Sequence, residues 1–263
     1  MRDKNIIYQD DGSGFNNDYS DETISRGSST WRALAKCYLY MFFALIISAG
    51  IAVGGFFGLR QLVLNANTQA QLEVISTGYL IALITSSIGV IVMMIVTMFV
   101  AVRNKKGGLV CLAFYSVFMG VLLSSIMLSI YATSYDLRSF AETIGWAFLA
   151  TVGVFGAMSL YGFLAKEHGR ALIYGIVGLF TGVLIMTLMN IFMQSTTLMW
   201  VIGYAYIALL MLYVGFDTWQ MKRHAESGAL TDGWAVYYAL QLYSDFIYLF
   251  VRLAILIAAN KER

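Results

Sequence analysis

The chain has 263 residues, of which 59% are hydrophobic and only 12% are charged, and its formal net charge is +2. Soluble domains carry about 25% charged residues, so this composition predicts an integral membrane protein in a lipid bilayer. The near-neutral net charge gives no support for a nucleic-acid partner.

Residues 1–30 are rich in Gly, Ser, Asn and Asp and contain few hydrophobic side chains. A segment of this composition cannot bury enough apolar surface to offset the entropy of folding. We therefore expect two regions: a disordered acidic cytoplasmic tail over residues 1–30 and a transmembrane domain over residues 31–263.

Seven apolar segments follow the tail, each long enough to cross a hydrocarbon core of about 30 Å as a helix. None shows the alternation of a barrel strand, and helices satisfy their backbone hydrogen bonds within lipid. The sequence therefore predicts an all-α membrane protein, a seven-transmembrane-helix bundle. The predicted spans are 35–59, 77–102, 108–131, 142–164, 171–193, 198–221 and 234–258.

The basic residues between the spans predict the orientation in an inner or plasma membrane. With a cytoplasmic N-terminus, seven basic residues fall in inner links and two in outer links, which is a positive-inside bias. Seven spans then place the C-terminus outside; the alternative is that the last segment re-enters, which keeps the C-terminus inside. The inner residues are Arg103, Lys105, Lys106, Lys166, Arg170, Lys222 and Arg223, and the outer ones are Arg60 and Arg138.

Glycines at spacings of four residues occur in the first and fifth spans. Small residues at this spacing let membrane helices approach closely. We expect them to pack within the bundle, with dimerisation as the alternative. They are Gly50, Gly54, Gly58, Gly178 and Gly182.

Each of the last two spans carries one carboxylate, Asp217 in the sixth and Asp245 in the seventh. The midpoint between them is residue 231, inside the polar linker AESGALTDG. In an antiparallel hairpin both acids therefore lie at about the same depth and can meet. An acid within a membrane helix is costly and usually functional.

Two carboxylates within a few ångströms in a low dielectric cannot both be ionised cheaply, so they share a proton. Such a pair can sense pH. When both are deprotonated, Asp217 and Asp245 form an oxygen-rich, doubly negative site suited to Ca²⁺.

Four polar residues of the seventh span, Gln241, Asp245, Tyr248 and Arg252, share one helix face. A membrane helix cannot turn such a stripe to lipid, so we expect the seventh helix to be central, with Gln241 and Tyr248 lining an ion pathway. Arg103 and Arg252 are candidate counter-charges that latch the acids.

Simpler interpretations stay open for these residues. Arg103 also fits a positive-inside anchor, Asp217 a solvated acid near its helix end, and Asp245 a structural polar contact. His224 is expected to be a solvated loop residue. No hydrolase, metalloprotease or nucleotide-binding motif is present, so the sequence predicts neither an enzyme nor a bound cofactor.

The last hairpin, LYVGFDTWQMKR followed by ALQLYSDFIYLFVRLA, resembles the C-terminal signature of the Bax inhibitor-1 family, also called the transmembrane Bax inhibitor motif family. The segments FYSVFMGVLLSSIMLSIY and FAETIGWAFLATVGVFGAMSLYGFLAKEHGRALIYGIVGLF resemble its middle region. The resemblance covers about residues 31–258.

This resemblance implies a seven-helix bundle with a central last helix and a pH-sensitive Ca²⁺ leak. The family's paired aspartates correspond to Asp217 and Asp245, and its latching arginine falls at Val102 or Arg103. Some bacterial relatives carry an additional acid in the second helix; this sequence has none between Leu80 and Val102.

Two functions of different classes follow. The first is a bacterial-type calcium leak channel or transporter gated by protonation of Asp217 and Asp245. The alternative is a regulatory membrane protein that binds a membrane-bound AAA protease, or acts in a stress or cell-death pathway, without transport; its contact would be the tail over residues 1–30. An intramembrane aspartyl enzyme is a remote third interpretation.

Overall fold

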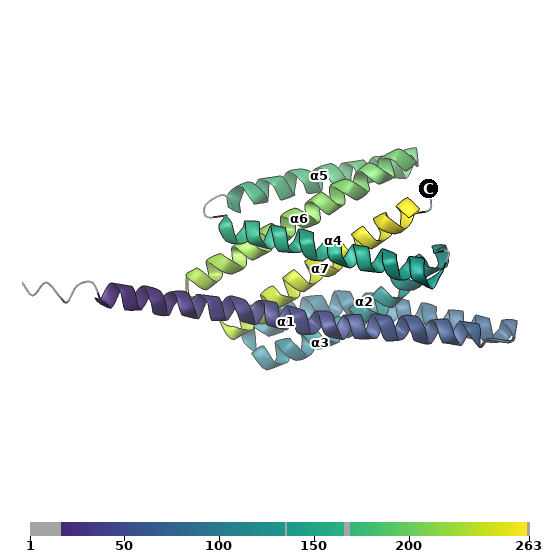
Figure 1. Ribbon diagram of the computed structural model, residues 1–263, viewed down its shortest axis with the longest axis horizontal. Helices are drawn as coiled ribbons and strands as arrows, with labels where there is room; N and C mark the ends of the chain where they lie inside the picture. Colours follow the sequence, from purple (N-terminus) through teal and green to yellow (C-terminus); the bar gives the residue numbers. More distant parts are fainter. Residues whose placement is uncertain (1–16, 135, 166–168, 262–263) are drawn as a thin grey trace, which may run out of the picture.

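The computed structural model describes residues 17–134, 136–165 and 169–261, which form seven helices running alternately in opposite directions (Figure 1). Every one of these helices contains a stretch long and apolar enough to cross a membrane. The predicted all-α, seven-helix membrane fold is therefore confirmed. The helices are α1 (Asn17–Leu64), α2 (Gln69–Arg103), α3 (Lys105–Thr133), α4 (Leu137–Leu164), α5 (Gly169–Met193), α6 (Thr196–Glu226) and α7 (Asp232–Lys261).

Several helices are longer than the predicted spans. α1 begins at Asn17 and so reaches into the segment expected to be a tail, while residues 1–16 lie outside the described residues, as does Lys166. Once a helix has formed, each added residue gains one hydrogen bond for the dihedrals it fixes. Continuation past the apolar stretch therefore costs little.

Polar side chains cap the helices in the short links. Thr68 accepts a hydrogen bond from the Gln71 amide at the start of α2. Asn104 ends α2 and accepts from the first amides of α3, and Asp136 caps α4. These caps satisfy amides that have no partner within a helix, so neighbouring helices can reverse direction within a few residues.

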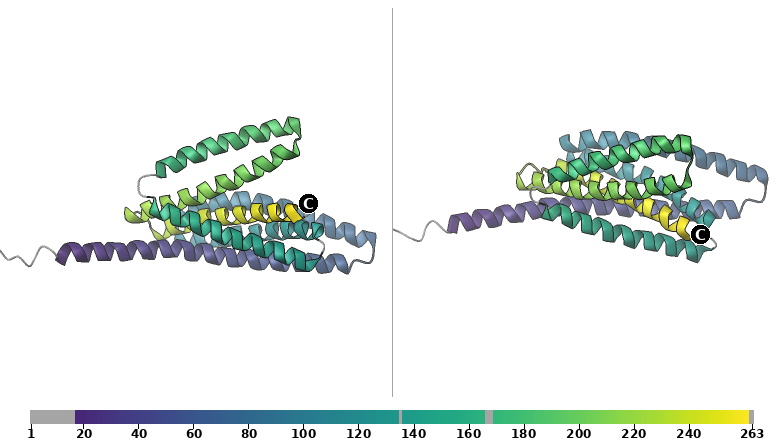
Figure 2. Two further views of the ribbon diagram at one scale, coloured as in Figure 1. Left: turned by 45° about the horizontal axis from the view of Figure 1, so that its top comes forward. Right: turned by 90° about the horizontal axis from the view of Figure 1, so that it is seen from above.

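α7 lies at the centre of the bundle, as predicted. It packs against α1, α2, α3, α4 and α6, whereas α5 packs mainly against the outer side of α6 (Figures 1 and 2). Most side chains of α7 between residues 235 and 249 are buried. α7 is also one uninterrupted helix of 30 residues, a length that favours a complete crossing over re-entry.

The closest helix contacts use glycines other than those singled out by their spacing. A Cβ atom on Gly162 of α4 would lie 2.4 Å from the carbonyl oxygen of Gly215 on α6. The predicted packing of the spaced glycines within the bundle is wrong, because their faces point away from neighbouring helices. A Cβ atom would meet nothing within 4 Å at Gly50, Gly54, Gly58, Gly178 or Gly182.

Candidate functional site: a buried aspartate pair

Two aspartates meet between α6 and α7. The carboxyl groups of Asp217 and Asp245 lie close enough to interact with each other, and the two residues are only 7% and 9% exposed. The link between the helices spans residues 227–231, ten residues after Asp217 and fourteen residues before Asp245, so the antiparallel hairpin places the two acids at similar depths. The hairpin thus brings the two acids together.

A hydrogen bond between these carboxyl groups would require a proton. An ionised carboxylate can only accept hydrogen bonds, so one member of the pair would have to be protonated to donate. Oδ2 of Asp245 is buried and has no hydrogen-bond partner in the part of the chain that the structure describes. A buried acceptor left without a partner costs about 1–3 kcal/mol. A proton or a cation at this oxygen would offset that cost.

Hydroxyl groups surround the pair. Tyr213 on α6 and Tyr238 on α7 lie close enough to interact electrostatically with Asp217. The residue before Asp245, Ser244, has its hydroxyl 3.0 Å from that of Tyr115 on α3. Tyrosine hydroxyls of α6 and α7 therefore lie near the pair, and a further pair of hydroxyls joins α7 to α3.

The pair alone offers an incomplete calcium site. Ca²⁺ takes about six to eight oxygen ligands, and two carboxylates supply at most about four. No group of three or more His, Cys, Asp or Glu residues that could hold a metal occurs among the described residues. The donor set fits a passing ion better than a tightly held one.

His224 extends this polar region toward the α6–α7 link. Its Nδ1 atom is hydrogen-bonded to the Tyr238 hydroxyl, and its ring packs on Trp234 with centroids 4.9 Å apart. The prediction that His224 is a solvated loop residue is wrong, because α6 continues to Glu226 and the ring is partly buried. The sequence signal for this contact is weak: Trp234 and Tyr238 are four positions apart in α7 and therefore share the helix face that meets His224.

Neither candidate arginine lies at the pair. Arg103 is exposed at the last turn of α2. A Cβ atom on Gly233 would lie 2.3 Å from the Ala101 carbonyl oxygen, so this end of α2 meets the first turn of α7. Gly233 is twelve residues, or about 18 Å, from Asp245 along the helix. That distance is more than an arginine side chain spans.

Arg252 lies toward the other end of α7. Its guanidinium carbon is 4.4 Å from the centre of the Tyr206 ring on α6, which is cation–π geometry. Among the described residues, no ion pair joins Asp217 or Asp245 to any basic side chain. In this structure the acids are partnered by each other.

The polar stripe of α7 is buried only in part. Asp245 faces the interior, and Gln241 donates a hydrogen bond to the Tyr237 hydroxyl at 3.0 Å. Tyr248 is 38% exposed and Arg252 is exposed as well. Figure 2 shows why: α5 and α6 lean away from the other helices toward the end of the bundle where Arg252 lies.

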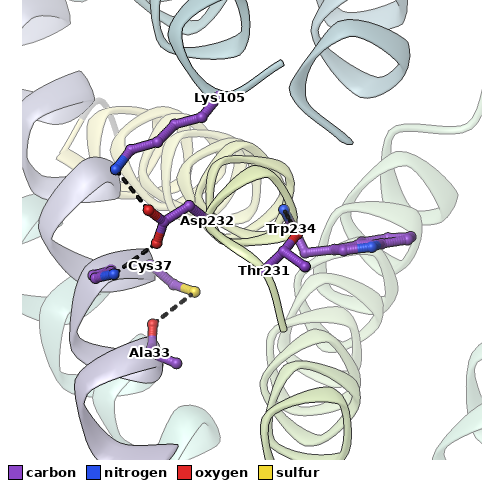
Figure 3. Close-up of polar contacts among 7 residues, drawn as sticks. Ala33, Cys37, Lys105, Thr231, Asp232 and Trp234 are labelled. Carbon is purple, nitrogen blue, oxygen red and sulfur yellow. Dashed lines mark hydrogen bonds and ion pairs between the residues drawn. The ribbon is translucent and has the colours of Figure 1, made fainter. Parts of the chain in front are cut away.

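A second charged cluster holds the start of α7. Asp232 accepts from Lys36 of α1 at 2.6 Å and from Lys105 of α3 at 2.8 Å (Figure 3). Thr231 caps the same turn by accepting from the Trp234 amide. The sequence shows Asp232 only as part of the polar linker. Its ion pairs could not be predicted, because their partners are far away in the chain and leave no local sequence pattern.

Comparison with known proteins finds relatives among bacterial membrane proteins. Inner membrane protein YbhL of Escherichia coli (strain K12) is 27% identical over 247 residues, which cover 89% of this chain and 94% of that protein. An uncharacterised membrane protein of Streptococcus pyogenes serotype M6 is 32% identical over 160 residues, covering 60% of this chain and 66% of that protein. YrjE of Lactococcus lactis is 29% identical over 163 residues, covering 61% and 66%.

The family comparison spans almost the whole described structure. Residues 30–262 match the family described as inhibitor of apoptosis-promoting Bax1. The match includes all seven apolar stretches and both aspartates, so the resemblance of the last hairpin extends to the entire membrane domain. This multi-pass membrane protein belongs to the Bax inhibitor family.

Proposed function

We propose that the protein is a calcium leak channel or transporter of a bacterial inner membrane, gated by the proton that Asp217 and Asp245 share. The observation that supports it is the close approach of their carboxyl groups in the interior of the bundle. The inner-membrane location rests on the similarity to YbhL.

The chemistry of the pair supplies the gate. With one proton the pair carries a single negative charge and holds α6 and α7 together through its hydrogen bond. When that proton leaves, two like charges face each other in a low dielectric, which favours either separation of the helices or entry of a cation. Ca²⁺ and protons therefore compete for the same oxygens.

The route for protons would begin at His224. Its hydrogen bond to Tyr238 brings a titratable ring at the helix end into contact with a hydroxyl that lies near Asp217. An imidazole ring has one nitrogen that donates and one that accepts a hydrogen bond, so it can pass a proton between that surface and the Tyr238 hydroxyl. His224 and Tyr238 thus join the acids as functional candidates.

The test is Ca²⁺ influx into proteoliposomes across the range from about pH 6 to pH 8, in which coupled carboxyls and histidine titrate. Wild type would be compared with Asp217→Asn and Asp245→Asn. Glu226→Gln is the matched control, because Glu226 is a surface acid on the same helix as Asp217. We expect both Asn variants, but not the control, to move or flatten the pH profile. Wild-type profiles in both would overturn the gating proposal.

The regulatory function is the second candidate, and the length of α1 supports it. The predicted apolar span of α1 begins at residue 35, whereas the helix begins at Asn17. Eighteen residues therefore precede the predicted span, which is about 27 Å of helix that a membrane-bound AAA protease could contact. Deletion of residues 1–29 separates the two functions: a leak pathway keeps its Ca²⁺ flux, and a regulator loses its co-purifying protease.

A further inference from the structure

A large apolar groove lies between α1 and α4. The two helices contact each other through stacked Phe56 and Phe140, with ring centroids 4.8 Å apart, and again through Tyr38 and Phe163 at 6.2 Å. A cavity of about 1010 Å³ lies along the same pair of helices. This volume is at the upper end of the usual range for ligand pockets.

The floor of the groove is α7. Phe246, Ile247 and Phe250 line the cavity from behind, and Figure 1 shows α7 passing behind α1 and α4. Phe246 is also held edge-on by Phe155 of α4, with centroids 5.4 Å apart. The floor is therefore a fixed surface of the central helix, on a different face from Asp245.

The walls of the groove continue into the outer surface of the bundle. Phe42 and Ile46 of α1 and Phe148 of α4 line the cavity and are 58%, 51% and 51% exposed. These residues belong to the membrane-crossing stretches. The groove consequently opens sideways at the depth of the lipid hydrocarbon.

The chemistry of the lining selects the occupant. A cavity lined by apolar side chains does not hold water, and leaving it empty forfeits the dispersion contacts of its walls. The lining runs on α1 from Tyr38 to Phe57, nineteen residues or about 28 Å. That length is most of a hydrocarbon core of about 30 Å.

Basic side chains lie at one end of the groove. Leu137 and Phe57 line it there, and Arg60 lies one helical turn beyond Phe57. Arg138, which follows Leu137, has a side chain that is 86% exposed. Glu142, the neighbouring acid, contacts both Arg138 and Lys261. The groove thus ends beside basic groups that can contact a phosphate, and nearby acids offset part of their charge.

We propose that the groove between α1 and α4 is a binding site for a membrane phospholipid. The acyl chains lie on Phe246, Ile247 and Phe250, and the phosphate lies at Arg60 and Arg138. This site is separate from the aspartate pair and does not depend on the calcium function.

Photolabelling tests the acyl-chain site directly. The full-length protein is reconstituted in bilayers containing a phospholipid with a diazirine on its acyl chain, irradiated, and mapped by mass spectrometry. We expect labels on Phe246, Ile247 or Phe250, which an acyl chain reaches by entering the groove. Labels confined to the exposed walls and to Tyr248 would overturn the proposal.

Two variants would plug the groove from opposite walls. Gly145 lines the cavity, and a Cβ atom there meets nothing within 4 Å, so Gly145→Phe projects into the groove without a clash. Ala49→Phe does so from α1. Gly153→Phe is the matched control, because Gly153 of α4 is equally open and is not part of the lining. We expect loss of α7 labelling in both plugs and not in the control; equal labelling in all three would contradict the site.

Competition experiments identify which class of lipid supplies the bound acyl chain. Unlabelled phospholipid should displace the label, whereas a diacylglycerol with the same chains should compete more weakly because it lacks the phosphate. Combined Arg60→Gln and Arg138→Gln should abolish that difference. Free fatty acid competing as well as phospholipid would overturn the choice of ligand, and each outcome is read without measuring Ca²⁺ flux.

Discussion

At the scale of single residues, a hydrogen bond between Asp217 and Asp245 would have a measurable consequence for stability. In Asp245→Asn, the amide can still donate to the Asp217 carboxylate, so we expect near wild-type thermal stability in detergent. In Asp245→Leu, Asp217 stays buried without a partner, and we expect a loss of about 1–3 kcal/mol. Equal stability of the two variants would show that the contact carries no energy.

A second residue-scale prediction concerns Tyr238. Removing its hydroxyl in Tyr238→Phe breaks the hydrogen bond with His224 and the polar connection toward Asp217. We expect Ca²⁺ flux to respond more slowly to a rapid pH change on the His224 side of the membrane, with little change at steady state. Stopped-flow measurement on oriented proteoliposomes would resolve the delay.

The neighbouring tyrosine supplies the control for this experiment. Tyr237 has its hydroxyl bonded to Gln241 instead of His224, so Tyr237→Phe removes the same group from the adjacent position. Its response time should match wild type. An identical delay in both variants would mean that the aromatic cluster as a whole, and not the His224 contact, sets the rate.

At the scale of the helices, the close packing of α4 against α6 depends on the absence of a side chain at Gly162. A methyl group there would lie 2.4 Å from the Gly215 carbonyl oxygen and 2.9 Å from Thr218. Backbone atoms cannot move aside as a flexible side chain can, so the helices must separate. We expect Gly162→Ala to destabilise the protein by about 1–3 kcal/mol in thermal unfolding.

A second glycine of α4 distinguishes packing from helix propensity. A methyl group at Gly153 would meet no other atom within 4 Å, so Gly153→Ala adds only the propensity of alanine over glycine. That variant should be as stable as wild type or slightly more stable. Comparable losses in both variants would rule out the α4–α6 approach as the cause.

Hydropathy was sufficient to predict the seven helices, because each needs about 20 apolar residues to cross the membrane. Helix ends were less predictable: α2 begins at Gln69, eight residues before the predicted span, since Thr68 provides a cap that hydropathy does not detect. The meeting of Asp217 and Asp245 followed from hairpin geometry alone. The Lys36–Asp232–Lys105 cluster did not, because it depends on how three helices pack.

At the scale of the whole molecule, the central helix separates two regions of opposite character. Its polar region, with Asp245 and Ser244, faces α3 and α6. Its apolar region, with Phe246 and Ile247, faces the groove between α1 and α4. A change in the packing of α7 therefore reaches both the carboxyl pair and the lipid-facing surface.

The last prediction concerns the orientation of this bundle. Seven antiparallel spans would put the chain ends on opposite sides of the membrane, and the bias of basic residues predicts a cytoplasmic N-terminus. We expect an alkaline phosphatase fused after Arg263 to be active, since that enzyme works only outside the cytoplasm. The same reporter fused after Thr231, which precedes α7, should be inactive. Inactivity at both positions would mean that α7 does not carry the chain across the membrane. Activity only after Thr231 would mean that the orientation of the bundle is the reverse of the predicted one, with the aspartate pair nearer the outer surface.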